Sequence, residues 1–86
     1  MDYFLYVLKS LKDGNLYIGS TENIENRLTL HNNGKMRSTK GRTPFVLIHT
    51  EKYSSRSEAV KKELFLKSPK GYTEKRKIVE KTQLKK

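Results

Sequence analysis

Residues 16–31 read LYIGSTENIENRLTLH, and this stretch predicts a strand that runs through a turn into a short helix. The helix is expected over residues 24–33, because Thr21 or Asn23 can cap its start and Gly34 can end it. The segments on either side of this strand and helix then define the remainder of the fold.

Those segments predict two further strands and two further helices. We expect strands at residues 3–9, 15–20 and 45–53, with residues 45–48 in the sheet core, and helices from Ser55 or Ser57 to Lys67 and over residues 73–81. A turn at residues 12–15 should pair the first two strands as a hairpin, and residues 35–43 should form a basic loop. The expected order is β-β-α-β-α-α. This is an α+β fold in which a small, mainly antiparallel three-stranded sheet is flanked by helices, as a single domain over residues 1–86.

The composition places this domain among small basic proteins. The 86 residues include 19 Lys and Arg against 9 Asp and Glu, which leaves a formal net charge of +10. Such an imbalance attracts polyanions, of which nucleic acid is the usual one. An anionic membrane surface is the weaker alternative, because no expected helix combines a broad apolar face with a basic one. Simple solubility or a ribosome-associated role without chemistry would also account for the charge.

The same composition argues against several classes of protein. The sequence contains no cysteine, so it has neither a disulfide framework nor a thiolate metal site, which fits a cytoplasmic protein. It shows no transmembrane span or secretory signal, and its longest apolar run is residues 3–8. We expect a monomer, although nothing in the sequence defines the oligomeric state.

Two polar side chains lie where the first helix should be apolar. On a helical wheel of residues 24–33, Arg27 and His31 fall in the middle of the apolar arc, one turn apart. Arg27 could extend along the surface with its charge in water, and His31 could be a hydrogen-bonded residue at the core boundary. Because the two are adjacent, we favour a polar cleft that both side chains line.

Glu63 repeats this anomaly on the next long helix, where it falls in the middle of the apolar face of residues 57–67. An exposed ion pair with Lys67, one turn later, would contribute only about 0.3 kcal/mol. Desolvating a carboxylate without a strong partner costs far more, about several kcal/mol. Glu63 therefore either reaches water at the sheet edge or faces a polar cleft that holds a cation, and we favour the cleft.

The hairpin supplies another wall of this cleft. If residues 13–14 are the two central turn residues, Leu8 pairs with Gly19. Tyr6, Leu8, Tyr17 and Gly19 then project from one face, and Gly19 leaves a notch between the two phenols. A register slip of one residue would place the two tyrosines on opposite faces.

At these residues the sequence resembles the GIY-YIG endonuclease superfamily, in particular its small stand-alone UPF0213 branch. The second of the two strand motifs that name the family is intact as Tyr17-Ile18-Gly19, and the first is present as Phe4-Leu5-Tyr6 with its tyrosine kept. The family's helical arginine falls on Arg27, the His or Tyr one turn later on His31, and the metal-binding glutamate on Glu63. The likeness covers nearly the whole chain.

The resemblance implies a metal-dependent endonuclease that hydrolyses phosphodiester bonds in DNA, directed by structure or damage and with little sequence specificity. Glu63 would hold one Mg²⁺ or Mn²⁺, and Arg27 would bind the non-bridging phosphate oxygens. Tyr17 would take the proton from the attacking water, since the positive charges of Arg27 and the metal favour a phenolate. Tyr6 and His31 would orient Tyr17 and the phosphate or relay the proton, with His31 as the alternative base.

The partner implied by the resemblance is nucleic acid, most readily DNA. Four basic residues of the expected loop would bind its phosphates as point charges, so that binding weakens with salt: Lys35, Arg37, Lys40 and Arg42. Gly19 would have a structural role at the site. We expect no interaction with a membrane.

Two departures from the family pattern keep other functions open. Ser20 follows the YIG motif where repair nucleases carry a lysine, and no asparagine follows Glu63, where several larger relatives have one. One alternative is a non-catalytic, basic nucleic-acid-binding module of the same fold. Another is a small RNA- or ribosome-associated protein in which Arg27 and His31 bind phosphate.

Overall fold

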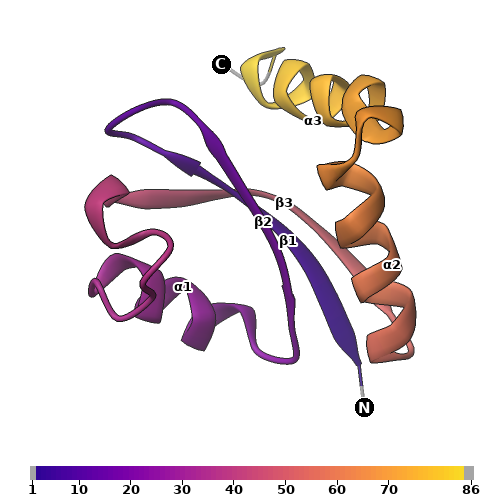
Figure 1. Ribbon diagram of the computed structural model, residues 1–86, viewed down its shortest axis with the longest axis horizontal. Helices are drawn as coiled ribbons and strands as arrows, with labels where there is room; N and C mark the ends of the chain where they lie inside the picture. Colours follow the sequence, from indigo (N-terminus) through magenta and orange to yellow (C-terminus); the bar gives the residue numbers. More distant parts are fainter. Residues whose placement is uncertain (1, 85–86) are drawn as a thin grey trace.

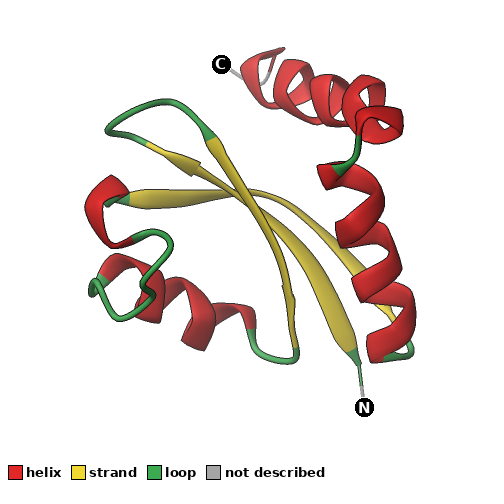
Figure 2. Ribbon diagram, viewed as in Figure 1, coloured by secondary structure: helices red, strands yellow, loops and turns green. Residues whose placement is uncertain are grey.

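A computed structural model describes residues 2–84, and it confirms the expected α+β fold and the order of its elements (Figure 1). The strands are β1 (Tyr3–Ser10), β2 (Leu16–Thr21) and β3 (Phe45–Tyr53), and the helices are α1 (Ile24–Asn32), α2 (Arg56–Lys67) and α3 (Tyr72–Leu84). Two short 3₁₀ turns, Lys40–Arg42 and Pro69–Gly71, precede β3 and α3 (Figure 2). Within residues 2–84, no helix has the length and apolar character needed to cross a membrane.

The sheet is antiparallel throughout and has the strand order β2-β1-β3. Its central strand, β1, pairs with a neighbour on each side and is covered on both faces, so that residues 5–8 are all buried. This explains why β1 is apolar without alternation, the pattern expected of a strand with two buried faces.

The hairpin register differs from the prediction by two residues. Leu8 lies opposite Tyr17, and Tyr6 lies opposite Gly19. The two-residue turn was wrong because β1 continues to Ser10, whose backbone N–H donates to the carbonyl of Asn15 at 2.9 Å across a longer turn. Since side chains alternate with a period of two, a shift of two residues keeps the expected set on one face.

The helices are divided between the two faces of the sheet, with α1 on one side and α2 and α3 on the other (Figure 1). The α1 face carries a cluster of Tyr6, Leu8 and Phe45, with Tyr17, Ile24 and Leu28 packed against it. The opposite face carries Leu5, Val7, Ile18, Leu66 and Ile78, with Leu16, Ile48 and Tyr53. The strand β2 lies at the edge of the sheet, where helices from both faces can reach it.

The prediction that residues 45–48 lie in the core is correct for only part of that segment. Phe45 is buried and Ile48 is half-buried, but Val46 and Leu47 are each 39% exposed. The reason is that β3 is an edge strand, so a neighbouring strand covers it on one side only. The register shift between Val7 and Leu8, opposite this part of β3, further interrupts the alternation of buried side chains.

The helix ends follow the capping residues of the sequence. Asn23 rather than Thr21 caps α1, with its side chain accepting from the backbone N–H of Asn26 at 2.9 Å. Ser55 rather than Ser57 caps α2, and Gly34 follows α1 in the left-handed region at φ +74°. The third helix, α3, is longer than predicted at both ends.

A polar cluster on β3 joins the strand to the helices of the same face. The Glu51 carboxylate lies 2.7 Å from Nε2 of His49 and accepts from the Tyr53 hydroxyl at 2.5 Å. Lys62 of α2 forms ion pairs with Glu51 and with Glu74 of α3. These contacts fix α2 and α3 against the sheet and so help to position Glu63, one residue after Lys62.

Candidate active site

Tyr6 and Gly19 face one another across β1 and β2, and the glycine makes room for the phenol. A Cβ atom at residue 19 would lie 2.6 Å from the Tyr6 hydroxyl oxygen and 2.7 Å from the ring carbon that bears it. The expected notch at Gly19 is therefore filled by Tyr6 itself, which is 1% exposed. The role of Gly19 in this structure is to admit the tyrosine.

A chain of hydrogen bonds leads from this phenol through α1 to the following loop. The Tyr6 hydroxyl lies 3.1 Å from Nε2 of His31, and Nδ1 of His31 lies 2.7 Å from Oγ1 of Thr39. Because the Thr39 hydroxyl donates to the Met36 carbonyl, it accepts from Nδ1. This network assigns the proton of a neutral His31 to Nδ1 and leaves Nε2 to accept from Tyr6.

His31 and Tyr6 are both held in their neutral forms. Burial, with the Arg27 charge acting in the same direction, lowers the pKa of His31 below its ordinary value. Burial also raises the pKa of Tyr6, and the nearby Tyr17 and Glu63 act in the same direction. Since His31 is completely buried and uses both ring nitrogens, it is placed to orient Tyr6 rather than to contact a substrate.

Tyr17 is the more accessible of the two tyrosines. It is half-buried, and its ring centroid lies 6.3 Å from that of Tyr6 and 4.7 Å from that of His31. The three rings form one packed group on the α1 face of the hairpin. The wheel of α1 predicted this burial correctly, because His31 is the one buried residue of that helix.

Glu63 reaches the same edge of the sheet from α2. One of its carboxylate oxygens accepts from the Ser20 hydroxyl at 2.9 Å, and the other lies 2.7 Å from the Lys67 ammonium. The Glu63 side chain is only 19% exposed, so its carboxylate is partly removed from water and interacts instead with Ser20 and Lys67. The Lys67 ammonium also lies 5.9 Å from the centroid of the Tyr17 ring, which joins the glutamate to the aromatic group.

Arg27 completes the group from α1. It is half-buried, and its guanidinium lies near enough to the Tyr6 hydroxyl to oppose the rise in the pKa of that phenol. Glu63 acts on the same hydroxyl with the opposite sign. An arginine from α1 and a glutamate from α2 therefore both act on the Tyr6 hydroxyl.

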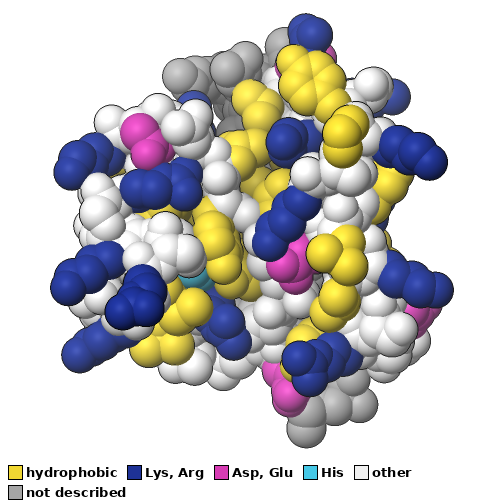
Figure 3. Space-filling model, viewed as in Figure 1, with side chains coloured by type: hydrophobic (Ala, Val, Ile, Leu, Met, Phe, Trp, Pro, Cys, Tyr) yellow, Lys and Arg dark blue, Asp and Glu magenta, His cyan; other side chains and the backbone are white. Residues whose placement is uncertain are grey.

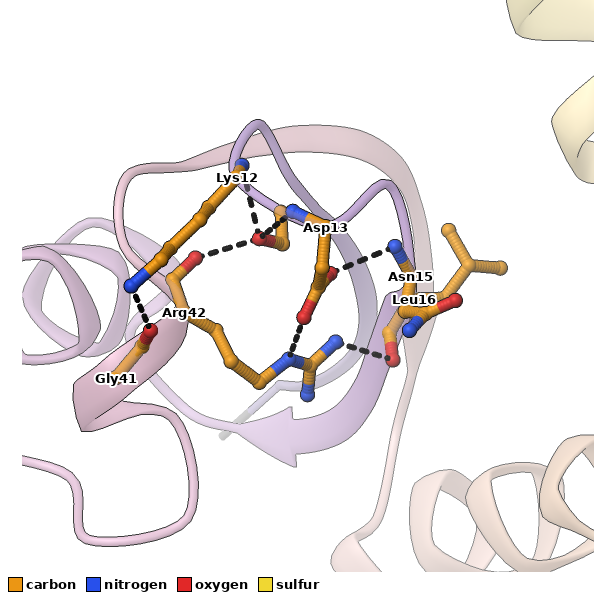
Figure 4. Close-up of polar contacts among 7 residues, drawn as sticks. Lys12, Asp13, Asn15, Leu16, Gly41 and Arg42 are labelled. Atoms are coloured by element: carbon orange, nitrogen blue, oxygen red, sulfur yellow. Dashed lines mark hydrogen bonds and ion pairs between the residues drawn. The ribbon is translucent and has the colours of Figure 1, made fainter.

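Arg42 has contacts that differ from the expected role of a free phosphate-binding charge. Its Nε donates to the Asp13 carboxylate at 2.9 Å, and a terminal nitrogen donates to the Leu16 carbonyl at 3.3 Å (Figure 4). The Arg42 carbonyl accepts from the Ser10 hydroxyl, and Lys12 donates to the carbonyl of Gly41. Arg42 thus connects the loop to the hairpin, because its guanidinium donates to Asp13 and to Leu16.

The other three basic residues of the loop, Lys35, Arg37 and Lys40, are exposed. None of them forms an ion pair within the described part of the chain. Figure 3 shows Lys and Arg side chains on both sides of a strip of exposed hydrophobic side chains. The face seen there is suited to a polyanion that lies across the strip.

The protein atoms near Glu63 could supply only some of the oxygen ligands that a hard divalent cation needs. Among the described residues there is no group of three or more His, Asp or Glu side chains placed to hold a metal. One carboxylate is nevertheless compatible with Mg²⁺, which commonly keeps several waters and completes its shell with substrate phosphate oxygens. The Lys67 ammonium beside Glu63 shows that the carboxylate already attracts a cation.

Comparison with known proteins agrees with this arrangement. The sequence model described as the GIY-YIG catalytic domain matches residues 2–77. The chain belongs to the GIY-YIG family. This membership places the GIY-YIG domain described above in a family of nucleases and confirms the resemblance noted in the sequence.

Relatives of this GIY-YIG domain are small proteins of similar length. A UPF0213 protein of Staphylococcus haemolyticus is 43% identical over 67 residues, which are 77% of this chain and 80% of the relative. A UPF0213 protein of Natronomonas pharaonis is 44% identical over 68 residues, 78% and 79% of the two chains. The NMR structure of a UPF0213 protein from Bacillus halodurans is 34% identical, with a TM-score of 0.54 over 93% of this chain and 84% of that one.

Three contacts of the GIY-YIG site were not expected from the sequence. Ser20 donates to Glu63, Thr39 accepts from His31, and Lys67 lies beside Tyr17 as well as Glu63. The helical spacing of residues 63 and 67 had indicated the ion pair between them, but not the position of Lys67 over the Tyr17 ring. No sequence pattern distinguishes Thr39 from the other polar residues of its loop.

Proposed function

We propose that this GIY-YIG domain is a metal-dependent endonuclease that hydrolyses phosphodiester bonds in DNA, directed by structure or damage with little sequence specificity. The observation that carries the proposal is that contacts with Ser20 of β2 and with Lys67, which lies over the Tyr17 ring, bring the Glu63 carboxylate to the β2 edge beside the aromatic group. Arg27 of α1 acts on the Tyr6 hydroxyl of the same group. A cationic fork, a carboxylate and two phenols are the groups needed to bind a phosphodiester and to move a proton beside it.

Arg27 binds the non-bridging oxygens of the scissile phosphate. Its planar guanidinium can donate two parallel hydrogen bonds to a phosphate, which the point charge of a lysine cannot reproduce. The half-buried position of Arg27 strengthens this interaction, because charges interact more strongly where water is partly excluded.

Glu63, with Ser20 beside it, provides the protein ligand of one Mg²⁺ or Mn²⁺. When bound, the ion supplies positive charge against the negative charge that develops on the phosphate and the leaving oxygen. The Ser20 hydroxyl, by donating to the carboxylate, fixes the orientation of Glu63. A site with a single protein carboxylate would leave the remaining positions of the ion to water molecules and to substrate phosphate oxygens.

Tyr17 takes the proton from the attacking water, and Tyr6 and His31 hold Tyr17 in position for this step. Tyr17 is the accessible phenol of the group, whereas His31 is buried with both nitrogens engaged. This step requires the phenolate form of a tyrosine, which nearby positive charge favours. His31 therefore acts through Tyr6 and the packing of the three rings rather than as the base.

The test is nicking of supercoiled plasmid by the parent, by Glu63→Gln and by Arg27→Lys, with Mg²⁺ or Mn²⁺ and in EDTA. We expect nicking that requires the metal and that falls at least about 100-fold in each variant. Glu58→Gln, on the exposed side of the same helix, is the matched control and should retain parental activity. Nicking that persists in EDTA or in both site variants would contradict the proposal.

A non-catalytic nucleic-acid-binding module is the second candidate. One observation favours it: the Lys67 ammonium lies 2.7 Å from the Glu63 carboxylate that accepts from Ser20, so the charge of that carboxylate is already compensated. In that case the parent would bind DNA in a salt-dependent manner without nicking it, and Glu63→Gln would bind with unchanged affinity.

A further inference from the structure

A hollow of about 490 Å³ lies beside Tyr17, along the edge strand β2. Its walls come from the hairpin, which contributes residues 14–18, and from two lysines, Lys67 at the end of α2 and Lys75 in the first turn of α3. No acidic side chain of the described residues lines it. The hollow is therefore lined by two cationic side chains and by apolar ones that include Leu16 and Ile18.

A tightly packed corner joins α2 and α3 beside the hollow. Gly71 is buried there, and a Cβ atom at this residue would lie 2.1 Å from the carbonyl oxygen of Phe65. The 3₁₀ turn between the two helices therefore packs directly on the backbone of α2, which fixes the direction in which α3 leaves the corner. Lys67 and Lys75 thus line the hollow from helices on either side of this packed corner.

The charges of the two lysines are not equally available. Lys67 is paired with Glu63 at 2.7 Å, whereas Lys75 forms no ion pair within the part of the chain that the structure describes. Lys75 is also only partly exposed, although it has no acidic partner to hold it there. An uncompensated, partly buried ammonium on the wall of a hollow is suited to an anionic ligand.

We propose that this hollow binds a nucleic-acid phosphate next to the scissile one, with Lys75 as its principal ligand and Lys67 as a second cation. The inference rests on the proposed function, because Tyr17 links the hollow to the catalytic group. It places the substrate backbone across the β2 edge, from the aromatic group toward the corner of α2 and α3.

The neighbouring surface limits how far this path extends. A second hollow of about 370 Å³ shares Leu16 and Lys75 with the first and continues along α3. There Arg76 is paired with Glu80 at 3.2 Å, so its charge is already compensated. The cationic part of the surface therefore ends near Lys75, and the site suits one phosphate rather than a long tract.

The experiment measures the affinity of the full chain for a fluorescent DNA duplex in EDTA, by anisotropy, at several salt concentrations from about 50 to about 200 mM. Lys75→Gln should weaken binding on the order of tenfold at about 0.1 M salt and lower the salt slope by about 1. Lys75→Arg should retain both. Lys77→Gln, an exposed lysine of α3 that does not line the hollow, is the matched control for loss of one charge.

The outcomes separate this inference from the proposed function. A deficit for Lys75→Gln well beyond that of Lys77→Gln, with rescue by Lys75→Arg, supports the phosphate site. Equal effects of the two glutamine variants overturn it, whether or not the parent nicks plasmid. If the parent binds DNA without nicking it, the binding comparison still tests the phosphate site, and only the nuclease assignment is contradicted.

Discussion

The hydroxyl of Tyr6 lies 3.1 Å from Nε2 of His31, and both side chains are almost completely buried. The pair connects β1 to α1 through one polar contact inside an otherwise apolar layer. It explains how a histidine can occupy the core-facing side of a helix, since each buried polar atom finds a partner. It also sets the position of the ring of Tyr17, which packs on His31.

Replacing Tyr6 with phenylalanine removes this hydrogen bond and keeps the ring. We expect a loss of about 1 kcal/mol in the free energy of unfolding, because Nε2 of His31 is left buried without a donor. If Tyr6 positions the catalytic group, plasmid nicking should also fall by about 10- to 100-fold. Tyr53→Phe, at a phenol of the opposite face, is the control and should leave nicking unchanged.

Adding a methyl group at Gly19 tests the close packing of the two strands. Gly19→Ala should lower the free energy of unfolding by about 1 to 3 kcal/mol, because the Tyr6 ring is buried and hydrogen-bonded and cannot move away cheaply. Gly41→Ala is the matched control, since a Cβ atom there meets nothing within 4 Å. Chemical denaturation of both variants is the measurement, and equal stability of the two would contradict the packing described here.

The buried His31 predicts a specific dependence of stability on pH. Its pKa is lower in the folded chain than the ordinary value of about 6.5 in the unfolded chain. The stability that its neutral form contributes is therefore complete above about pH 6.5 and is lost as the pH falls through the lower, folded value. Denaturation curves at about pH 7.5 and about pH 5 should show this loss in the parent.

Replacement of each histidine in turn identifies the group responsible. His31→Gln should be less stable than the parent at neutral pH and should show a smaller decline toward acid pH. His49→Gln, which removes the other histidine, should retain the decline that His31 causes. A decline that is unchanged in His31→Gln would show that another group controls it.

Substitution of Arg42 should affect mainly the stability of the protein, and substitution of Arg37 mainly its binding to DNA. Arg42→Ala should lower the melting temperature, because it removes the contacts to Asp13 and Leu16 that fasten the loop. Arg37→Ala should leave the melting temperature unchanged and weaken DNA binding on the order of tenfold at low salt. Thermal denaturation and anisotropy on the same preparations test both, and an unchanged melting temperature for Arg42→Ala would contradict its structural role.

The sequence predicted the fold well because its signals are local or periodic. The two-sided apolar pattern of β1, the capping residues Asn23 and Ser55 and the wheel of α1 each depend on residues close together in the chain. The same periodicity placed Arg27, His31 and Glu63 on inward-facing sides of their helices. These three polar groups on apolar faces are what led to the prediction of a polar cleft.

The parts that could not be predicted depend on contacts between distant segments. The hairpin register was wrong because a turn of several residues was not distinguishable from a two-residue turn by its Asp13-Gly14 pair. The use of Arg42 inside the protein depends on the loop folding back onto Asp13, twenty-nine residues earlier. Similarly, the hydrogen bond from Ser20 to Glu63 forms only because β2 and α2 meet in the fold, and no local sequence pattern predicts that contact.

We propose that the edge of β2 beside Glu63, Ser20 and Tyr17 binds the catalytic metal ion. Titration of the ¹⁵N-labelled protein with Mn²⁺ tests it directly, because the paramagnetic ion broadens the amide signals nearest to it. We predict the strongest broadening at Ser20 and Glu63, and its loss in Glu63→Gln. Broadening that centres on Glu51 and Glu74, where β3 meets α2 and α3, or that persists unchanged in Glu63→Gln, would contradict this assignment.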